Sequence, residues 1–101
     1  MKKLAPKIST VGLDNTYYMP GTYDFRFIMG GLGSIVKSLD VEMLDPDRAP
    51  LSSSFRLWGK KVMCSFLIEN TTPSGVCIFK IRASDNTGKS IEAIFSPWVI
   101  L

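Results

Sequence analysis

The feature that most constrains the fold of this chain is the pattern of residues 74–90, SGVCIFKIRASDNTGKS, in which inward apolar residues alternate with mostly polar outward ones. Successive side chains of a β-strand point to opposite faces, so this alternation predicts a strand with one face in a hydrophobic core. The run ends at Asp-Asn-Thr-Gly, residue types that favour a tight turn. Such a strand requires a second layer of structure against which its apolar face can pack.

The same period of two recurs through most of the remaining sequence. Alternating or apolar runs occupy residues 22–29, 34–44, 54–58, 61–69 and 89–95, with Gly or Pro between most of them. No window of about 11 residues keeps the i, i+3, i+4, i+7 apolar spacing of an amphipathic helix. A single all-β domain is therefore predicted, an antiparallel sandwich or barrel. Its expected core residues are Leu39, Val41, Phe66, Ile68, Phe79, Ile81, Ala83, Ile91 and Ala93.

The first 22 residues lack this regular pattern and are interrupted by Pro6, Gly12, Pro20 and Gly21. We therefore expect an extended N-terminal arm over residues 1–22, with room for a short edge strand around residues 7–11, and a folded body over residues 23–101. The arm is expected to be mobile in the isolated protein and to become ordered against a neighbour. Its basic residues are expected to meet an acidic surface there; they are Lys2, Lys3 and Lys7.

One part of the chain resembles a known family. The pattern consists of Gly75, Cys77, Phe79, Ile81, Ala83, Asp85, Asn86 and Gly88. It resembles the penultimate strand and final turn of Ig-like modules of the PKD, fibronectin type III and bacterial Ig-like kinds, and covers about a quarter of the chain. The resemblance implies a single antiparallel Ig-like β-sandwich. Cys77 stands where the family usually has tyrosine, so the hydrogen bond of a tyrosine corner is not available. A fold of this kind does not specify a function.

Catalytic chemistry is poorly represented in the sequence. There is no histidine, which excludes Ser-His-Asp and Cys-His nucleophile systems and imidazole metal sites. An enzyme would have to use carboxylates alone, as glycoside hydrolases do, and the candidates are Asp40, Glu42, Glu69 and Glu92. Because these residues alternate with apolar ones on predicted strands, they are interpreted as solvated charges. The protein is expected not to be an enzyme and to bind no cofactor.

The two cysteines and the acidic turns have structural explanations. Cys64 and Cys77 are expected to be reduced and buried. If strands 62–69 and 76–83 form a hairpin, Ile68 faces Cys77, Cys64 faces Ile81 and the two sulfurs lie roughly 13 Å apart; if the loop between them crosses from one sheet to another, the cysteines can face each other. The acidic and amide residues of the turns are interpreted as turn formers rather than as a calcium site. They are Asp45, Asp47, Asp85 and Asn86.

The chain carries more apolar residues than one sandwich face requires. Residues 61–69 and 76–81 are partly apolar on both faces, whereas a free monomer leaves one face of such strands polar. In the hairpin register Leu67 lies opposite Ile78, and their side chains form one outward patch. Excess apolar surface of this kind is typical of contacts between subunits. The predicted interface residues are Tyr17, Tyr18, Met19, Met63, Leu67, Val76, Ile78 and Trp98.

These patterns favour a structural subunit over the other classes of protein. The formal net charge is +3, and apart from Lys2, Lys3 and Lys7 the basic residues are scattered along the chain. No direct nucleic-acid partner is therefore expected. No signal-like apolar run and no apolar run of membrane length are present, so neither export nor a membrane partner is expected. The plan of one β-rich body with an extended arm resembles that of small tailed-phage capsid decoration proteins. It implies a homo-oligomeric virion subunit that contacts the major capsid protein and is assembled in the host cytoplasm.

Two alternatives remain at this stage. A tail, neck or baseplate subunit of the same virion has the same sequence features. A carbohydrate or cell-surface recognition module is the second alternative, because aromatic rings stack on sugar rings. The aromatic residues for that role are Tyr17, Tyr18, Trp58 and Trp98.

Overall fold

The computed structural model describes residues 7–32 and 35–101, and these residues form strands, turns and loops without a helix. Accordingly, this part of the chain contains no helix long and apolar enough to span a membrane. The strands are β1 (Lys7–Val11), β2 (Thr16–Tyr17), β3 (Gly21–Gly30), β4 (Val36–Leu44), β5 (Ser53–Trp58), β6 (Lys61–Ile68), β7 (Gly75–Val76), β8 (Ile78–Asp85), β9 (Ser90–Phe95) and β10 (Trp98–Val99).

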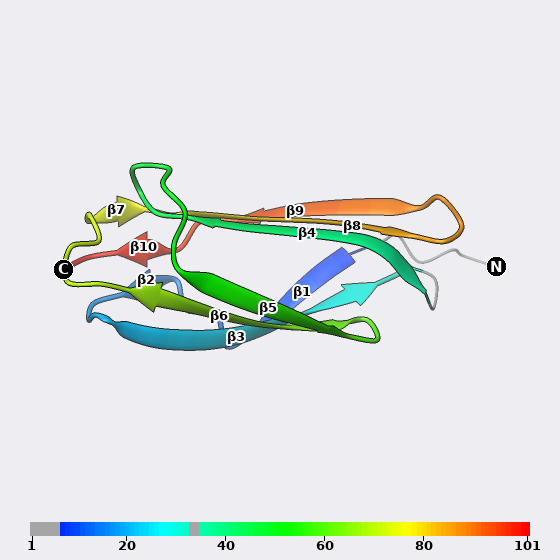
Figure 1. The fold of residues 1–101 in the computed structure, drawn as a ribbon, viewed down its shortest axis with the longest axis horizontal. Helices are drawn as coiled ribbons and strands as arrows, with labels where there is room; N and C mark the ends of the chain where they lie inside the picture. Colours follow the sequence, from blue (N-terminus) through cyan, green and yellow to red (C-terminus); the bar gives the residue numbers. More distant parts are fainter. Residues whose placement is uncertain (1–6, 33–34) are drawn as a thin grey trace.

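The strands form three sheets. Sheet A has the order β1-β3-β6-β5, sheet B the order β2-β10-β7, and sheet C the order β4-β8-β9. Figure 1 shows sheets A and C as two facing layers, with sheet B at the end where the C-terminus lies. The body is elongated, with extents of 49 × 22 × 21 Å. The all-β prediction is confirmed. The expectation of a single antiparallel arrangement is too simple, because β10 pairs with β2 in parallel.

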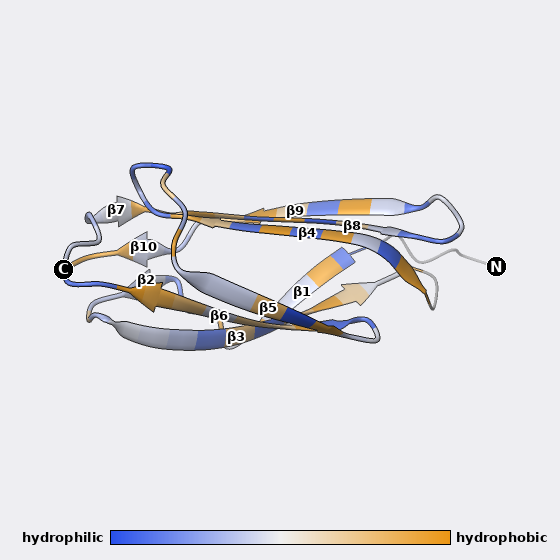
Figure 2. Cartoon of the chain, in the orientation of Figure 1, coloured by the Kyte–Doolittle hydropathy of each residue, from blue (hydrophilic) through white to orange (hydrophobic). Residues whose placement is uncertain are grey.

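Apolar side chains from sheets A and C meet in one core. Along β6 and β8 the buried residues occupy every second position, and Figure 2 shows the corresponding alternation of apolar and polar residues along β4 and β9. Phe66 of β6 contacts Phe79 of β8 across the core, with ring centroids 5.0 Å apart. The predicted core is confirmed: most of its residues are buried, and the others pack against it half-buried, namely Leu39, Val41 and Ala93.

Of the two arrangements left open for β6 and β8, the hairpin does not form. β6 pairs with β3 and β5, whereas β8 pairs with β4 and β9. Leu67 is therefore opposite Thr22, and Ile78 is opposite Leu44. The chain between β6 and β8 crosses from sheet A to sheet C, which was the alternative that sequence reasoning left open. Neither Ile68 and Cys77 nor Cys64 and Ile81 are strand partners.

Residues 7–22 belong to the folded body, which corrects the expected boundary between arm and body. β1 pairs with β3 from Lys7 to Val11, so the short edge strand is present. β2 pairs with β10, and Tyr17 is buried in the core. Its ring centroid lies 4.5 Å from that of Tyr23. Burial of this ring fixes the segment in place. Lys2 and Lys3, the expected basic contacts of the arm, lie outside the described residues.

Candidate interaction surfaces

The predicted interface residues do not form one patch. Met63 and Leu67 lie on the outer face of sheet A, because the alternate residues of β6 are buried in the core. Ile78 lies on the outer face of sheet C for the same reason. The outer faces of two facing layers point in opposite directions, so the expected contact between Leu67 and Ile78 does not exist. Tyr17, also predicted for the interface, is only 3% exposed.

A second group of the predicted residues does come together. Backbone hydrogen bonds from Trp98 N to Asn15 O (2.8 Å) and from Ile100 N to Tyr17 O (2.9 Å) hold the C-terminal residues beside β2. Val76 is the partner of Trp98 in β7. We call the exposed apolar group at this end of the body the terminal surface; it consists of Tyr18, Met19, Trp98, Ile100 and Leu101. Tyr18 and Met19 are about two-thirds exposed, at 67% and 69%.

The sandwich is closed along one side and open along the other. β1 of sheet A lies against β9 of sheet C, which places β5 and β4, the opposite edges of these sheets, on the other side. There the inward-facing side chains are not fully covered. Phe55 and Leu57 of β5 are 46% and 41% exposed, and Leu39 and Val41 of β4 are half-buried. Sequence reasoning did not find this open side, because it depends on the order of the strands.

The backbone of β5 has unpaired groups along this open side. Leu67 N donates to Ser52 O at 2.9 Å, so the backbone N–H and C=O groups of Ser52 point toward β6. Peptide groups in an antiparallel ladder alternate in direction, and the register from Ser53 to Trp58 is unbroken. The N–H and C=O groups of Phe55 and Leu57 therefore point away from β6, toward the free edge.

The backbone of β4 has the same kind of free edge. Leu51 N donates to Met43 O at 2.9 Å, so the connection between β4 and β5 covers this edge only near Met43. The register of β4 is regular from Ser38 to Leu44. By the same alternation, the N–H and C=O groups of Leu39 and Val41 point outward.

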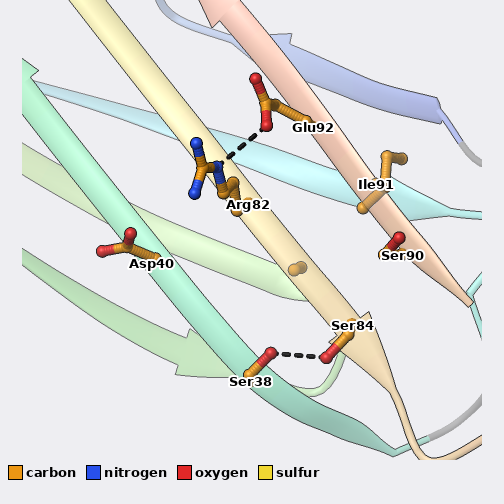
Figure 3. A pocket seen from close by; sticks show the side chains of 8 residues that line it. Ser38, Asp40, Arg82, Ser84, Ser90, Ile91 and Glu92 are labelled. Carbon is orange, nitrogen blue, oxygen red and sulfur yellow. Dashed lines mark hydrogen bonds and ion pairs between the residues drawn. The ribbon is translucent and has the colours of Figure 1, made fainter. Parts of the chain in front are cut away.

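Charges of opposite sign stand on the outer faces of these two edge strands. Arg56 is exposed on β5, and Asp40 is exposed on β4. Within the described residues, neither side chain takes part in an ion pair. Asp40 is the strand partner of Arg82, yet its carboxylate points away from Arg82 (Figure 3). Arg82 Nε instead donates to Glu92 Oε2 at 2.9 Å.

The carboxylates considered for catalysis do not form a catalytic pair. A shallow hollow of about 240 Å³ on sheet C contains Asp40 and Glu92, but Arg82 stands between them (Figure 3). Glu92 is bound to Arg82 and also lies 4.0 Å from Lys80 Nζ. Three serines, Ala83 and Ile91 line the rest of the hollow. The hydroxyls of Ser38 and Ser84 form a hydrogen bond. Glu69 does not line the hollow. Glu92 is thus paired with basic side chains on the outer face of a sheet. The hollow does not place an acid and a base on opposite sides of a substrate bond.

The aromatic residues considered for sugar binding are also separated. Trp58 is 77% exposed and lines a hollow of about 470 Å³ between β3, β5 and β6. Trp98 lies in sheet B, at the other end of the body from the turn that joins β5 to β6 (Figure 1). Since Tyr17 is buried, the four expected aromatic residues do not form one binding platform. The residues of the Trp58 hollow are Arg26, Ile28, Trp58, Lys60, Lys61 and Met63.

The cysteines and acidic turns have structural roles. Cys64 and Cys77 are free and buried, which confirms their prediction. Burial raises the pKa of Cys64 to about 12; burial and the negative charge of Asp45 raise the pKa of Cys77 to about 11. Both thiols are therefore protonated at neutral pH and are poor nucleophiles. Among the described residues, no group of three or more His, Cys, Asp or Glu is arranged to hold a metal ion.

Neither a protein-family model nor a curated protein matches this chain.

Proposed function

We propose that this protein is a non-enzymatic structural subunit of a large assembly and that it works through contacts with other protein subunits. The observation that carries this proposal is the presence of exposed apolar residues at two separate places, the terminal surface and the open side of the sandwich. Isolated apolar residues are normal on a protein surface, whereas groups of them mark contact sites. Two such groups on one small body allow it to contact two neighbours at once.

The assembly that we propose is the virion of a tailed bacteriophage, with the chain as a capsid decoration subunit. Support for this comes from the β-rich body, which is the part of the resemblance described above that the structure retains, and from the lack of a catalytic constellation among the described residues. An Ig-like form of the sandwich is part of the same proposal, supported by the burial of Cys77, Phe79 and Ile81 along the segment that resembles that family. A tail, neck or baseplate position in the virion is the runner-up.

Gradient sedimentation tests this proposal. A tagged copy of the chain is produced in its native cell, and the lysate is separated on a density gradient. We expect the 11.2 kDa chain to sediment with particles of much larger mass that contain nuclease-resistant DNA. A chain that stays at the top of the gradient contradicts the structural role, and a chain in large particles without DNA contradicts the virion assignment.

A pair of variants tests whether the terminal surface makes the contact with the particle. The double change Tyr18→Ser, Trp98→Ser removes two exposed rings and is expected to release the chain from the particles by at least about tenfold, because aromatic residues dominate the energy of interfaces. Ile94→Ser is the matched control, since Ile94 is 56% exposed on the outer face of sheet C. If both variants sediment like the unmodified chain, the terminal surface is not the contact.

A further inference from the structure

We infer that a second copy of this chain closes the open side of the sandwich, with β4 of each copy paired to β5 of the other. The inference rests on the proposed role as an assembly subunit and adds the identity of one neighbour. Three independent features of the open side lead to it: uncovered apolar side chains, unpaired backbone groups, and complementary charges.

The uncovered side chains require an apolar neighbour. Phe55 and Leu57 point to the same side of sheet A as their strand partners Cys64 and Val62, which are core residues. They remain exposed because sheet C has one strand fewer than sheet A and does not reach under β5. A second body placed along this side extends both layers and covers these side chains.

The unpaired backbone groups require a strand as that neighbour. All six residues of β5 are exposed, and a single one of them, Arg56, is charged. Natural edge strands usually prevent association by charges, prolines or bulges, so an exposed strand with little such protection is a site for strand addition. β4 of another copy also has an unused edge over residues 38–42, where its register is regular.

The directions of the strands allow a symmetric pair. β4 and β5 run in opposite directions along the body (Figure 1). A two-fold axis parallel to the strands places β4 of one copy beside β5 of the other, in antiparallel orientation and with both outer faces on the same side. The same rotation produces the reciprocal contact, as a two-fold interface requires.

A second two-fold arrangement of the two copies is possible, and the charges on β4 and β5 disfavour it. A two-fold axis perpendicular to the layers pairs β5 with β5 and β4 with β4. That arrangement brings Arg56 near its own copy, and on the other layer it brings Asp40 and Glu42 near theirs. Like charges on facing strands are destabilising. Pairing β4 with β5 instead places Asp40 beside Arg56 of the second copy, and neither has an ion-pair partner within the described part of one chain.

One register satisfies all three features. When Asp40 is opposite Arg56 of the second copy, Val41 is opposite Phe55 and Leu39 is opposite Leu57. These four apolar residues have their free backbone groups on the open side, so they form the hydrogen-bonded pairs of the new ladder, and their side chains continue the core. A shift by two residues toward Met43 is disfavoured because its carbonyl already accepts a hydrogen bond from Leu51.

A charge-swap experiment tests the pairing. Sedimentation velocity of the unmodified chain is expected to show a dimer. Arg56→Asp alone and Asp40→Arg alone each place like charges at both contacts, so each variant is expected to weaken dimerisation by at least about tenfold. An equal mixture of the two variants restores both contacts and is expected to return to the dimer. A mixture that stays monomeric overturns the assigned pair.

A backbone variant tests the strand addition itself. Leu57→Pro and Leu57→Ala both remove the leucine side chain, but proline also removes the outward N–H without breaking a bond to β6. The proline variant is expected to be monomeric at concentrations where the alanine variant still dimerises. Equal dimerisation of the two variants overturns strand pairing. An unmodified chain that is monomeric yet sediments with the large particles overturns this inference and leaves the proposed function standing.

Discussion

At the scale of single residues, two aspartates build the same turn at two places in the fold. In each turn the aspartate N–H donates to the carbonyl four residues later, at 2.8 Å for Asp45 and 2.9 Å for Asp85. Each carboxylate accepts hydrogen bonds from the N–H groups two and four residues later. The fourth position has a positive φ in both, 69° at Arg48 and 91° at Gly88. These contacts confirm the prediction that the aspartates are turn formers.

The Asp85 turn is expected to contribute more to stability than the Asp45 turn. Asp85 is 1% exposed, and its carboxylate also accepts a hydrogen bond from Thr87 Oγ1 at 2.7 Å. Asp85→Ala leaves these donors without their partner and is expected to lower the free energy of unfolding by about 1–3 kcal/mol. Asp45→Ala, at a half-buried site, is expected to cost less. Urea unfolding measures both, and an equal or smaller loss for Asp85→Ala contradicts the ranking.

The buried thiols predict a loss of stability in alkali. The pKa of Cys64 is raised to about 12 in the folded chain, whereas an exposed thiol titrates near about 8.5. The stabilisation from the protonated thiol is fully present below about pH 8.5 and is lost as the pH rises toward about 12, because the unfolded chain releases its proton first.

We expect the free energy of unfolding to fall between pH 8 and pH 10.5, with a contribution of about 2 kcal/mol from each thiol. The control is the double variant Cys64→Ala, Cys77→Ala, whose stability is expected to change less with pH over this range. The slopes are compared rather than the absolute stabilities, since the alanines also remove packing. Parallel slopes for the two proteins exclude the thiols as the cause.

At the scale of strands, the local sequence pattern was sufficient to predict where the long strands lie and which of their faces point into the core. It was not sufficient to predict which strands pair with each other. The alternation in residues 74–90 predicted the buried face of β8 correctly, because side-chain direction depends only on position along the strand. Pairing was wrong for β6 and β8, since strands consecutive in sequence are often hairpin partners and nothing in the two runs shows that the loop crosses between layers.

The N-terminal strands and the open side were missed for related reasons. β2 has two residues and pairs with β10 near the other end of the sequence, so no local period reveals it. Tyr17 and Tyr18 are neighbours in a segment without alternation, and only the tertiary structure distinguishes the buried ring from the exposed one. The free edges of β4 and β5 follow from sheet order, which local sequence does not contain.

These adjacent tyrosines provide a direct test of the assignment of β2. The ring of Tyr17 packs on Tyr23 and Phe66, and its hydroxyl accepts a hydrogen bond from Asp14 N at 3.0 Å. Tyr17→Ala is expected to lower the free energy of unfolding by about 3–5 kcal/mol. Tyr18→Ala, at an exposed site, is expected to change it by less than about 0.5 kcal/mol. Similar values for the two variants in thermal or urea unfolding contradict the burial of Tyr17.

At the scale of the whole molecule, the chain is a sandwich whose sides differ. One side is sealed where β1 lies against β9, one side is open at β4 and β5, and one end carries the terminal surface. β1 and β2 are therefore structural parts of the body, since β1 covers the edge of β3 in sheet A and β2 pairs with the C-terminal strand β10 in sheet B. An extended arm would be needed for contacts with neighbours but not for folding. Residues 7–20 are instead expected to be needed for folding of the body.

Deleting residues 1–20 tests this expectation. The deletion removes the pairing of β1 with β3 and the buried side chains of Ile8 and Tyr17, and it exposes the edge of β3. Full burial of an aliphatic side chain contributes about 1.5–3 kcal/mol and loss of a buried aromatic ring costs about 3–5 kcal/mol. Together these losses are comparable with the whole stability of a small domain. The truncated chain is expected to show no cooperative thermal transition by circular dichroism. The double variant Tyr18→Ser, Met19→Ser, which changes exposed residues of the same segment, is expected to melt like the unmodified chain. A truncated chain that also melts cooperatively, at the same midpoint, shows that residues 7–20 are an arm after all.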